Sequence, residues 1–156
     1  MNEKQAVFEE IFALAKARLP RNVEARSQKG AKGGGALLMI HDEHWCDASR
    51  MVTIHLKFTA SNRIALHVET FPYQNSDPVA LENKNTLLKN VRKALFGFSF
   101  EGYKELAPRN GWGTHDSSAV GYVKIDPDHV SYSAGVLAKL YEALEPSIDA
   151  QFETQK

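Results

Sequence analysis

The chain has 156 residues, 19 Lys and Arg against 19 Asp and Glu, one Cys and a hydrophobic fraction of 43%. This size predicts one domain over residues 1–156, and the zero net charge excludes a uniformly basic nucleic-acid coat and an acidic disordered tail. A single cysteine cannot form an internal disulfide, and no stretch of about 18 apolar residues is present, so we expect a cytoplasmic protein that does not enter a membrane.

The N-terminal segment is predicted to form a helix, because its apolar residues recur at helical spacing up to Ala15. Pro20 ends it, since a proline disfavours the helical conformation of the residue before it. The next stretch, 21–35, has four glycines and few apolar residues, which predicts a loop. A short apolar run over 36–40 predicts the first strand.

Two segments of alternating apolar and polar residues, 51–59 and 64–71, predict a β-hairpin. A two-residue turn would place the two apolar faces on opposite sides of the sheet. A three-residue turn at 60–62 instead pairs Phe58 with Ile64 and keeps the apolar faces together. The hairpin is therefore expected to have the longer turn.

This register has consequences for single residues. Asn62, which tolerates a positive φ angle, falls where such turns need a left-handed residue. His55 lies opposite His67 on the face that points away from the apolar side. Protonation of both imidazoles below about pH 6 would place like charges side by side and weaken the hairpin.

The second helix has the clearest predicted ends. Asp77 is expected to cap its N-terminus, Pro78 to be its first residue, and Gly97 to provide the left-handed stop. Its buried stripe is predicted to contain Leu81, Leu88, Val91 and Leu95. Its surface is predicted to carry Lys84, Lys89, Arg92 and Lys93.

Two shorter strands are predicted around 98–106 and 119–125, followed by a last helix that Pro146 kinks or restarts. The elements then follow the order α-β-β-β-α-β-β-α. This order predicts an α+β fold of two layers, in which helices pack against an antiparallel five-stranded sheet. It resembles the order of the small class I type III secretion chaperones, which are homodimers that bind an effector segment. The resemblance implies no site residues.

The densest polar cluster, 41–47, lies between the first and second predicted strands. It offers imidazole, thiolate and carboxylate groups, the ligand types that zinc and other transition metals use. His41, His44 and Asp47 are the candidate metal ligands, and a metal-dependent hydrolase is one function they would allow. A structural site needs four ligands, however, and no second Cys or His pair completes it. The alternative is a solvated hairpin loop whose acids and histidines face water.

Positive charge gathers between Lys16 and Gly35, where six basic residues accompany a single acidic one. Backbone N–H groups can approach a phosphate in the glycine-rich stretch 18–35. This stretch is not a Walker loop, because it precedes a strand and lacks the Gly-Lys-Ser/Thr ending. It is either a mobile solvated loop or a nucleic-acid-binding loop. The candidate nucleic-acid contacts are Arg21, Arg26, Lys29 and Lys32.

A long predicted hairpin tip, 111–118, carries a tryptophan between two glycines. Ser, His and Asp are adjacent here, but adjacent residues seldom converge on the one proton path that a catalytic triad needs. An exposed tryptophan flanked by tyrosines has the composition of a binding hot spot, whereas a tryptophan folded back would cap the core. The candidate partner contacts are Trp112, His115, Tyr103, Tyr122, His55 and His67.

The sequence favours binding over catalysis, since it holds no nucleophile–base pair, complete metal site or phosphate loop. It predicts a small protein-binding module without a cofactor, of adaptor, chaperone-like, immunity or inhibitor type. The expected partner is a protein, which includes a second copy of the chain in a homodimer. Nucleic-acid binding through the basic loop is the first alternative, and metal-dependent hydrolysis is the second.

Overall fold

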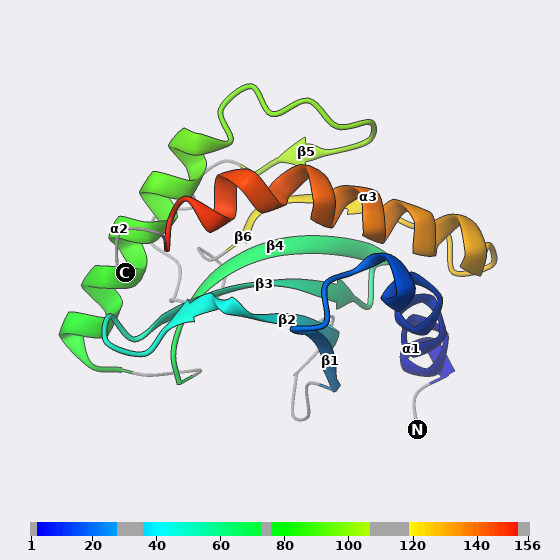
Figure 1. The fold of residues 1–156 in the computed structure, drawn as a ribbon, viewed down its shortest axis with the longest axis horizontal. Coiled ribbons are helices and arrows are strands. Elements are labelled where there is room, and N and C mark those ends of the chain that lie inside the picture. The colour runs from blue at the N-terminus through cyan, green and yellow to red at the C-terminus, as the bar shows by residue number, and fades with distance from the viewer. Residues whose placement is uncertain (1–2, 28–35, 73–75, 107–118, 153–156) are drawn as a thin grey trace.

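The computed structural model describes residues 3–27, 36–72, 76–106 and 119–152. In these ranges it shows an α+β fold with an antiparallel sheet and three α-helices (Figure 1). The helices are α1 (Glu3–Ala15), α2 (Pro78–Ala94) and α3 (Val130–Asp149), and a short 3-10 helix, η1 (Lys16–Arg18), follows α1. The strands are β1 (Val23–Ser27), β2 (Ala36–Asp47), β3 (Val52–Thr59), β4 (Arg63–Thr70), β5 (Lys104–Glu105) and β6 (Ala119–Lys124).

The sheet has six strands in these ranges, not the predicted five, in the order β1-β2-β3-β4-β6-β5. Along the chain, four strands lie between α1 and α2, so the order that resembles the secretion chaperones is not the order of this chain. The additional strand is β1, which falls in the predicted loop 21–35. Its residues are mostly polar, and pairing with β2 in the register Ala25↔Ile40 is what makes the segment a strand.

Strand β2 is longer than predicted and includes the whole polar cluster 41–47, which is therefore not a hairpin loop. Its pairing with β3 is irregular between His41 and Cys46, as at a β-bulge. Trp45 lies in this irregular part and is buried with 1% of its surface exposed. The chain turns after Asp47 instead.

The hairpin of β3 and β4 confirms the predicted register. Phe58 pairs with Ile64 and His55 with His67 across a three-residue turn. Asn62 in that turn has a φ angle of 61°, which is the left-handed conformation expected there. The parity of the alternating pattern was sufficient to decide the turn length.

Helix α2 begins as predicted, and its buried stripe is predicted in part, because Val91 and Leu95 are buried whereas Leu81 and Leu88 are only half-buried. The Asp77 side chain accepts hydrogen bonds from the Val79 and Ala80 amides at 2.8 and 3.3 Å, and Pro78 is the first helical residue. Gly97 has a φ angle of 75° just beyond the helix. The buried residues are Ala80, Lys84, Leu87 and Val91, so Lys84 is not on the surface.

The C-terminal elements also differ from expectation. Only Lys104–Glu105 forms a strand within the segment 98–106, where Phe98 and Phe100 stack on each other outside any strand. Helix α3 continues through Pro146 to Asp149 without a restart. No helix of the described ranges is both long enough and apolar enough to cross a membrane.

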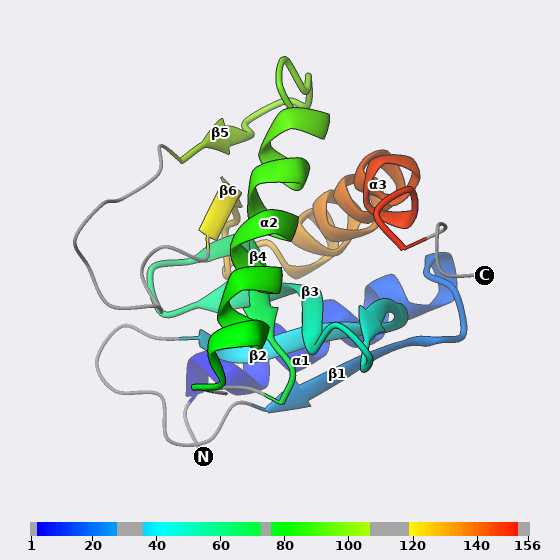
Figure 2. The same ribbon diagram turned by 90° about the vertical axis from the view of Figure 1, so that its left-hand side faces the viewer.

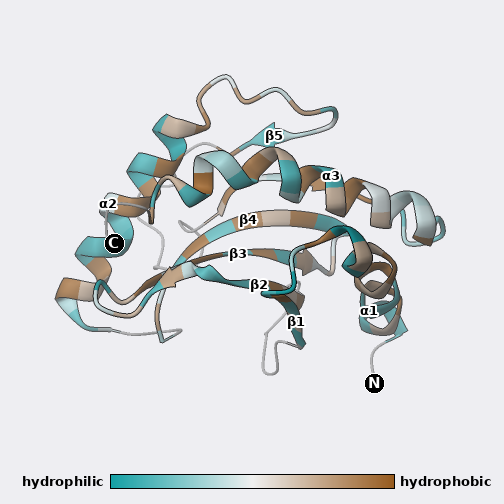
Figure 3. Ribbon diagram, in the orientation of Figure 1, coloured by the Kyte–Doolittle hydropathy of each residue, from teal (hydrophilic) through white to brown (hydrophobic). Residues whose placement is uncertain are grey.

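Helices α1 and α3 pack on the apolar face of the sheet. Phe8 of α1 stacks on Phe58 with ring centroids 4.8 Å apart, and Tyr141 of α3 stacks on Trp45 at 4.9 Å. Helix α2 crosses the ends of the strands (Figure 2), where Asn83 donates to the Arg50 carbonyl at 3.0 Å. Apolar residues recur along α1, β3 and α3, which together supply much of the core (Figure 3).

Candidate binding site

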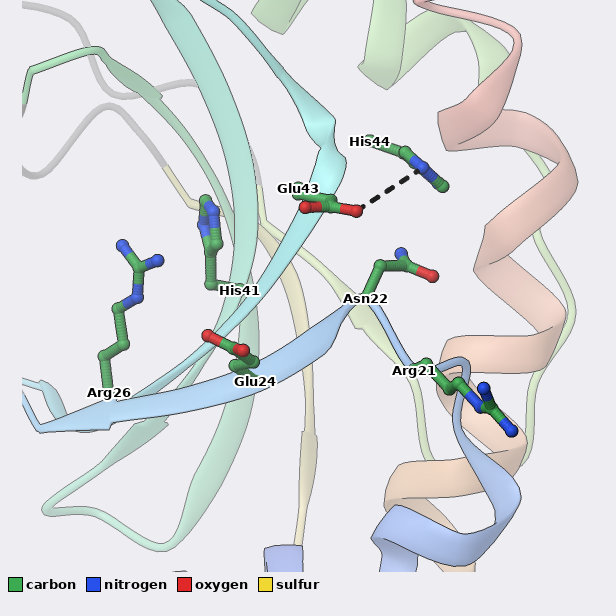
Figure 4. Close-up of a pocket in the computed structure, with 7 residues that line it drawn as sticks. All are labelled: Arg21, Asn22, Glu24, Arg26, His41, Glu43 and His44. Carbon is green, nitrogen blue, oxygen red and sulfur yellow. Dashed lines mark ion pairs between the residues drawn. The ribbon is translucent and has the colours of Figure 1, made fainter.

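A pocket with a volume of about 340 Å³ opens at the edge of the sheet formed by β1 and β2. Figure 4 shows its side chains arranged along the two strands and the turn before β1. We call it the edge pocket. Its lining residues, all of them polar, are Arg21, Asn22, Glu24, Arg26, His41, Glu43 and His44.

The alternation of β1 and its register with β2 position these side chains. Glu24 and Arg26 are two residues apart in a strand, so they share one face. His41 lies directly opposite Glu24, which places an imidazole beside the carboxylate. Beyond the paired residues, the Glu43 amide donates to the Asn22 carbonyl at 3.4 Å and holds the end of the pocket.

A buried carboxylate supports the pocket from behind. Asp42 is 2% exposed and accepts hydrogen bonds from the Asn22 side chain, the His44 amide (2.8 Å) and the Tyr141 hydroxyl. Burial and the neighbouring Asp42 carboxylate raise the pKa of Tyr141, so the phenol stays protonated and can donate. Asp42 therefore connects the turn before β1, strand β2 and helix α3.

The charges of the edge pocket are of both signs and mostly not paired with each other. His44 Nε2 lies 3.8 Å from a carboxylate oxygen of Glu43. Arg21, Glu24 and Arg26 form no ion pair with another described residue, and all three side chains are exposed. Burial lowers the pKa of His41, and the charges of Arg26 and His55 lower it further, so this imidazole is neutral at pH 7.

His41 also begins a row of three histidines that crosses the sheet. It pairs with His55 on β3, which pairs with His67 on β4. The rings of His55 and His67 are nearly parallel, with an interplanar angle of 6° and centroids 6.4 Å apart. The row thus leads from the edge pocket along the outer face, the face opposite α1 and α3.

The outer face of β3 and β4 carries a buried group of charged and titratable residues. Glu69 lies 2.6 Å from Lys57 Nζ, 3.2 Å from His55 Nε2 and 3.7 Å from His67 Nδ1. Both ring nitrogens of His55, Nδ1 of His67 and Oε2 of Glu69 are buried without a hydrogen bond. We call this group the outer-face cluster. Its members are His55, Lys57, His67, Glu69 and the buried Lys84 of α2.

The outer-face cluster favours neutral imidazoles and an ionised carboxylate. Burial lowers the pKa of His55, and burial together with the positive charge of Lys57 lowers the pKa of His67 to about 3. Burial works against ionisation of Glu69, but His55 and Lys57 outweigh it and lower the pKa of Glu69 to about 2. Burial also lowers the pKa of Lys84.

The structure places the predicted partner contacts in different surroundings. His55 is 2% exposed, so the outer face is not the solvated surface that the alternating pattern suggested. The Tyr103 ring packs edge-on against Phe98 at 5.0 Å, and Tyr122 is buried beneath the Arg63 guanidinium at 4.0 Å. The His67 side chain is 16% exposed. The remaining two predicted contacts, Trp112 and His115, lie outside the described residues.

The predicted nucleic-acid and metal residues are only partly brought together. Arg21 and Arg26 line the edge pocket, whereas Lys29 and Lys32 lie outside the described residues. His41 and His44 line the pocket too. Asp47 is held elsewhere, because its carboxylate accepts from Arg50 Nε at 2.5 Å and from the Ser49 hydroxyl at 2.8 Å. Within the ranges that the structure describes, no group of His, Cys, Asp and Glu is arranged to hold a metal ion.

Sequence reasoning missed Asn22, Glu24 and Glu43 as pocket residues and Lys57 and Lys84 as cluster residues. The signal for Lys57 was available, since the confirmed hairpin register places it on the same face as His55, His67 and Glu69. Glu24 could be placed in the pocket only from the pairing of β1 with β2, and no local sequence pattern predicts that pairing. No protein-family model matches the chain, and comparisons with curated proteins and with solved structures give no significant match.

Proposed function

We propose that the chain is a protein-binding module and that the edge pocket is part of its contact surface. The observation that carries the proposal is a pocket lined only by polar residues, with exposed charges of both signs that lack partners among the described residues. Complementary charge patterns give protein interfaces their specificity and speed their association. A partner that presents acidic groups to Arg21 and Arg26 and basic groups to Glu24 and Glu43 would fit this pattern.

The mixed signs argue against the two alternatives. A nucleic-acid backbone offers only negative charge, which Glu24 and Glu43 would repel at the point where Arg21 and Arg26 attract it. A metal-dependent hydrolase needs several ligands on one ion, and Asp47 is already engaged by Arg50. Protein binding therefore accounts for more of the pocket than either alternative.

Charge reversal in the pocket tests the proposal. Tagged full-length chain and the variant R21E/R26E would be used to capture and then titrate partners from the native cell. We expect the affinity for the specific protein partner to fall by about tenfold or more, equivalent to about 1.4 kcal/mol. The matched control is K89E/K139E, which makes the same change in net charge at two exposed helix positions.

The outcomes separate the candidate functions. Protein capture that is lost in R21E/R26E and kept in K89E/K139E supports the proposal. Equal capture by wild type and both variants contradicts it. Capture that disappears after nuclease treatment, with binding that weakens steeply as salt rises, would identify nucleic acid as the partner instead.

A further inference from the structure

The outer-face cluster combines deep burial with incomplete hydrogen bonding. His55, Lys57, Glu69 and Lys84 are each at most 5% exposed. Nδ1 of His55 and Nδ1 of His67 have no hydrogen-bond partner, and the 3.2 Å contact between His55 Nε2 and Glu69 Oε2 lacks the alignment of a hydrogen bond. Buried polar atoms without partners cost stability, so such a group needs a physical explanation.

A metal ion does not explain these free atoms. The Lys57 ammonium, 2.6 Å from Glu69 Oε1, already neutralises the carboxylate and would repel a metal cation placed at its other oxygen. The described residues also contain no group arranged to hold a metal. The remaining ligand of an imidazole lone pair is a proton, which His55 and His67 take up when the pH falls.

We propose that the outer-face cluster is an acid-sensitive latch. The cluster stays buried in a closed state while His55 and His67 are neutral, and it becomes exposed to water in an open state when they are protonated. This inference does not depend on the proposed function, because it concerns the chain alone. It rests on the placement of two stacked imidazoles in a buried group that already contains two lysines.

The charges around the two imidazoles make protonation unfavourable in the closed state. Lys57 of β3 and Lys84 of α2 act on His67, and Lys57 acts on His55. Across the row, His41 of β2 is the next titratable group, and behind it β1 contributes the pair Glu24 and Arg26. Among the described residues, Glu69 is the one carboxylate whose charge acts on both imidazoles. Each added proton therefore introduces a buried charge that this single carboxylate does not balance.

The size of the effect follows from proton linkage. In an open state both imidazoles regain an ordinary pKa near 6.5, whereas His67 stays neutral down to about pH 3 when the face is closed. Between pH 7 and pH 5, the His67 imidazole raises the equilibrium constant for opening by about 25-fold. His55, whose pKa burial also lowers, raises it further.

Amide hydrogen exchange at pH 7 and pH 5 measures this opening. For wild type we expect the opening constants of β3 and β4 amides, corrected for the intrinsic exchange rate, to rise by about 25-fold or more. In the variant H67Q the rise should be smaller than in wild type by a factor of about 25. In H55Q/H67Q the rise should nearly disappear. The control is H129Q, because the His129 side chain is 70% exposed.

Two results would overturn the latch. The first is a pH dependence in H55Q/H67Q equal to that of wild type. The second needs no variant and remains available if H55Q/H67Q does not fold. It is an imidazole titration followed by NMR on wild type, in which both rings titrate near pH 6.5 while the β3 and β4 amides stay protected. Rings that remain neutral until protection is lost support the latch.

Discussion

Asp42 shows how one residue connects three parts of the molecule. Its buried carboxylate accepts from Asn22, from the His44 amide and from Tyr141. A polar group is tolerated in such a buried place only when it is hydrogen-bonded. Its sequence neighbours His41 and Glu43 line the edge pocket, whereas the Asp42 side chain is buried behind it.

Tyr141→Phe is predicted to destabilise the fold by about 1–3 kcal/mol, because it removes one donor from the buried Asp42 carboxylate. Urea unfolding followed by circular dichroism measures the change. Tyr132→Phe is the matched control, since Tyr132 is on the same helix and 67% exposed, and it should change stability by less than about 0.5 kcal/mol. Equal stability of the two variants would show that the Tyr141 hydroxyl contributes nothing.

The elements differ in how much of them the sequence could predict. Alternation and turn chemistry determined the β3–β4 register, and the Asp77 cap and Pro78 determined the start of α2. Strand β1 could not be predicted, because its polar residues become a strand only by pairing with β2. The edge pocket depends on that pairing and was missed with it. The hairpin register brings His55, Lys57, His67 and Glu69 to one face, but their burial depends on what covers that face.

The cap of α2 gives a prediction at the scale of the element. Asp77→Ala should cost about 0.5–2 kcal/mol, because the Val79 and Ala80 amides lose the acceptor that the Asp77 side chain supplies. Asp77→Asn should restore most of that stability, since asparagine caps about as well as aspartate. Thermal unfolding compares the three chains. If the Asn variant were as unstable as the Ala variant, the charge rather than the cap would be responsible.

Two glycines make an opposed pair of predictions. A Cβ at position 121 would overlap the Tyr103 hydroxyl and lie 2.8 Å from the Lys104 carbonyl oxygen, so Gly121→Ala should disturb β5–β6 pairing and cost about 1–3 kcal/mol. A Cβ at position 135 in α3 would meet its nearest atom at 3.8 Å, so Gly135→Ala should stabilise by about 0.5–1 kcal/mol. Chemical denaturation should show shifts of opposite sign. Two shifts of the same sign would contradict the packing around Gly121.

At the scale of the whole molecule, stability is expected to fall in acid. His67 has a folded pKa of about 3 against 6.5 for an ordinary histidine, so the unfolded chain binds the proton more readily between these values. Stability is therefore complete above pH 6.5 and decreases by up to about 1.4 kcal/mol for each pH unit below it. Glu69, with a pKa of about 2 against 4.5, adds a second loss below pH 4.5.

Unfolding free energies from urea titrations at several pH values test this dependence. His67→Gln should make the curve less steep between pH 6.5 and pH 4.5, while leaving the part due to His55 and the loss due to Glu69 at lower pH. A wild-type free energy that stays constant from pH 7 to pH 4 would exclude a buried neutral imidazole at position 55 and at position 67.

The contacts between β2 and α3 also bear on how the chain folds. The Tyr141–Asp42, Arg50–Gln151 and Trp45–Asp149 hydrogen bonds join residues 99, 101 and 104 positions apart. Contacts of such large sequence separation slow folding, because a long segment must be ordered before they form. During synthesis the contacts between β2 and α3 therefore cannot form until α3 has left the ribosome. The tryptophan on β2 reaches its final surroundings only after that point.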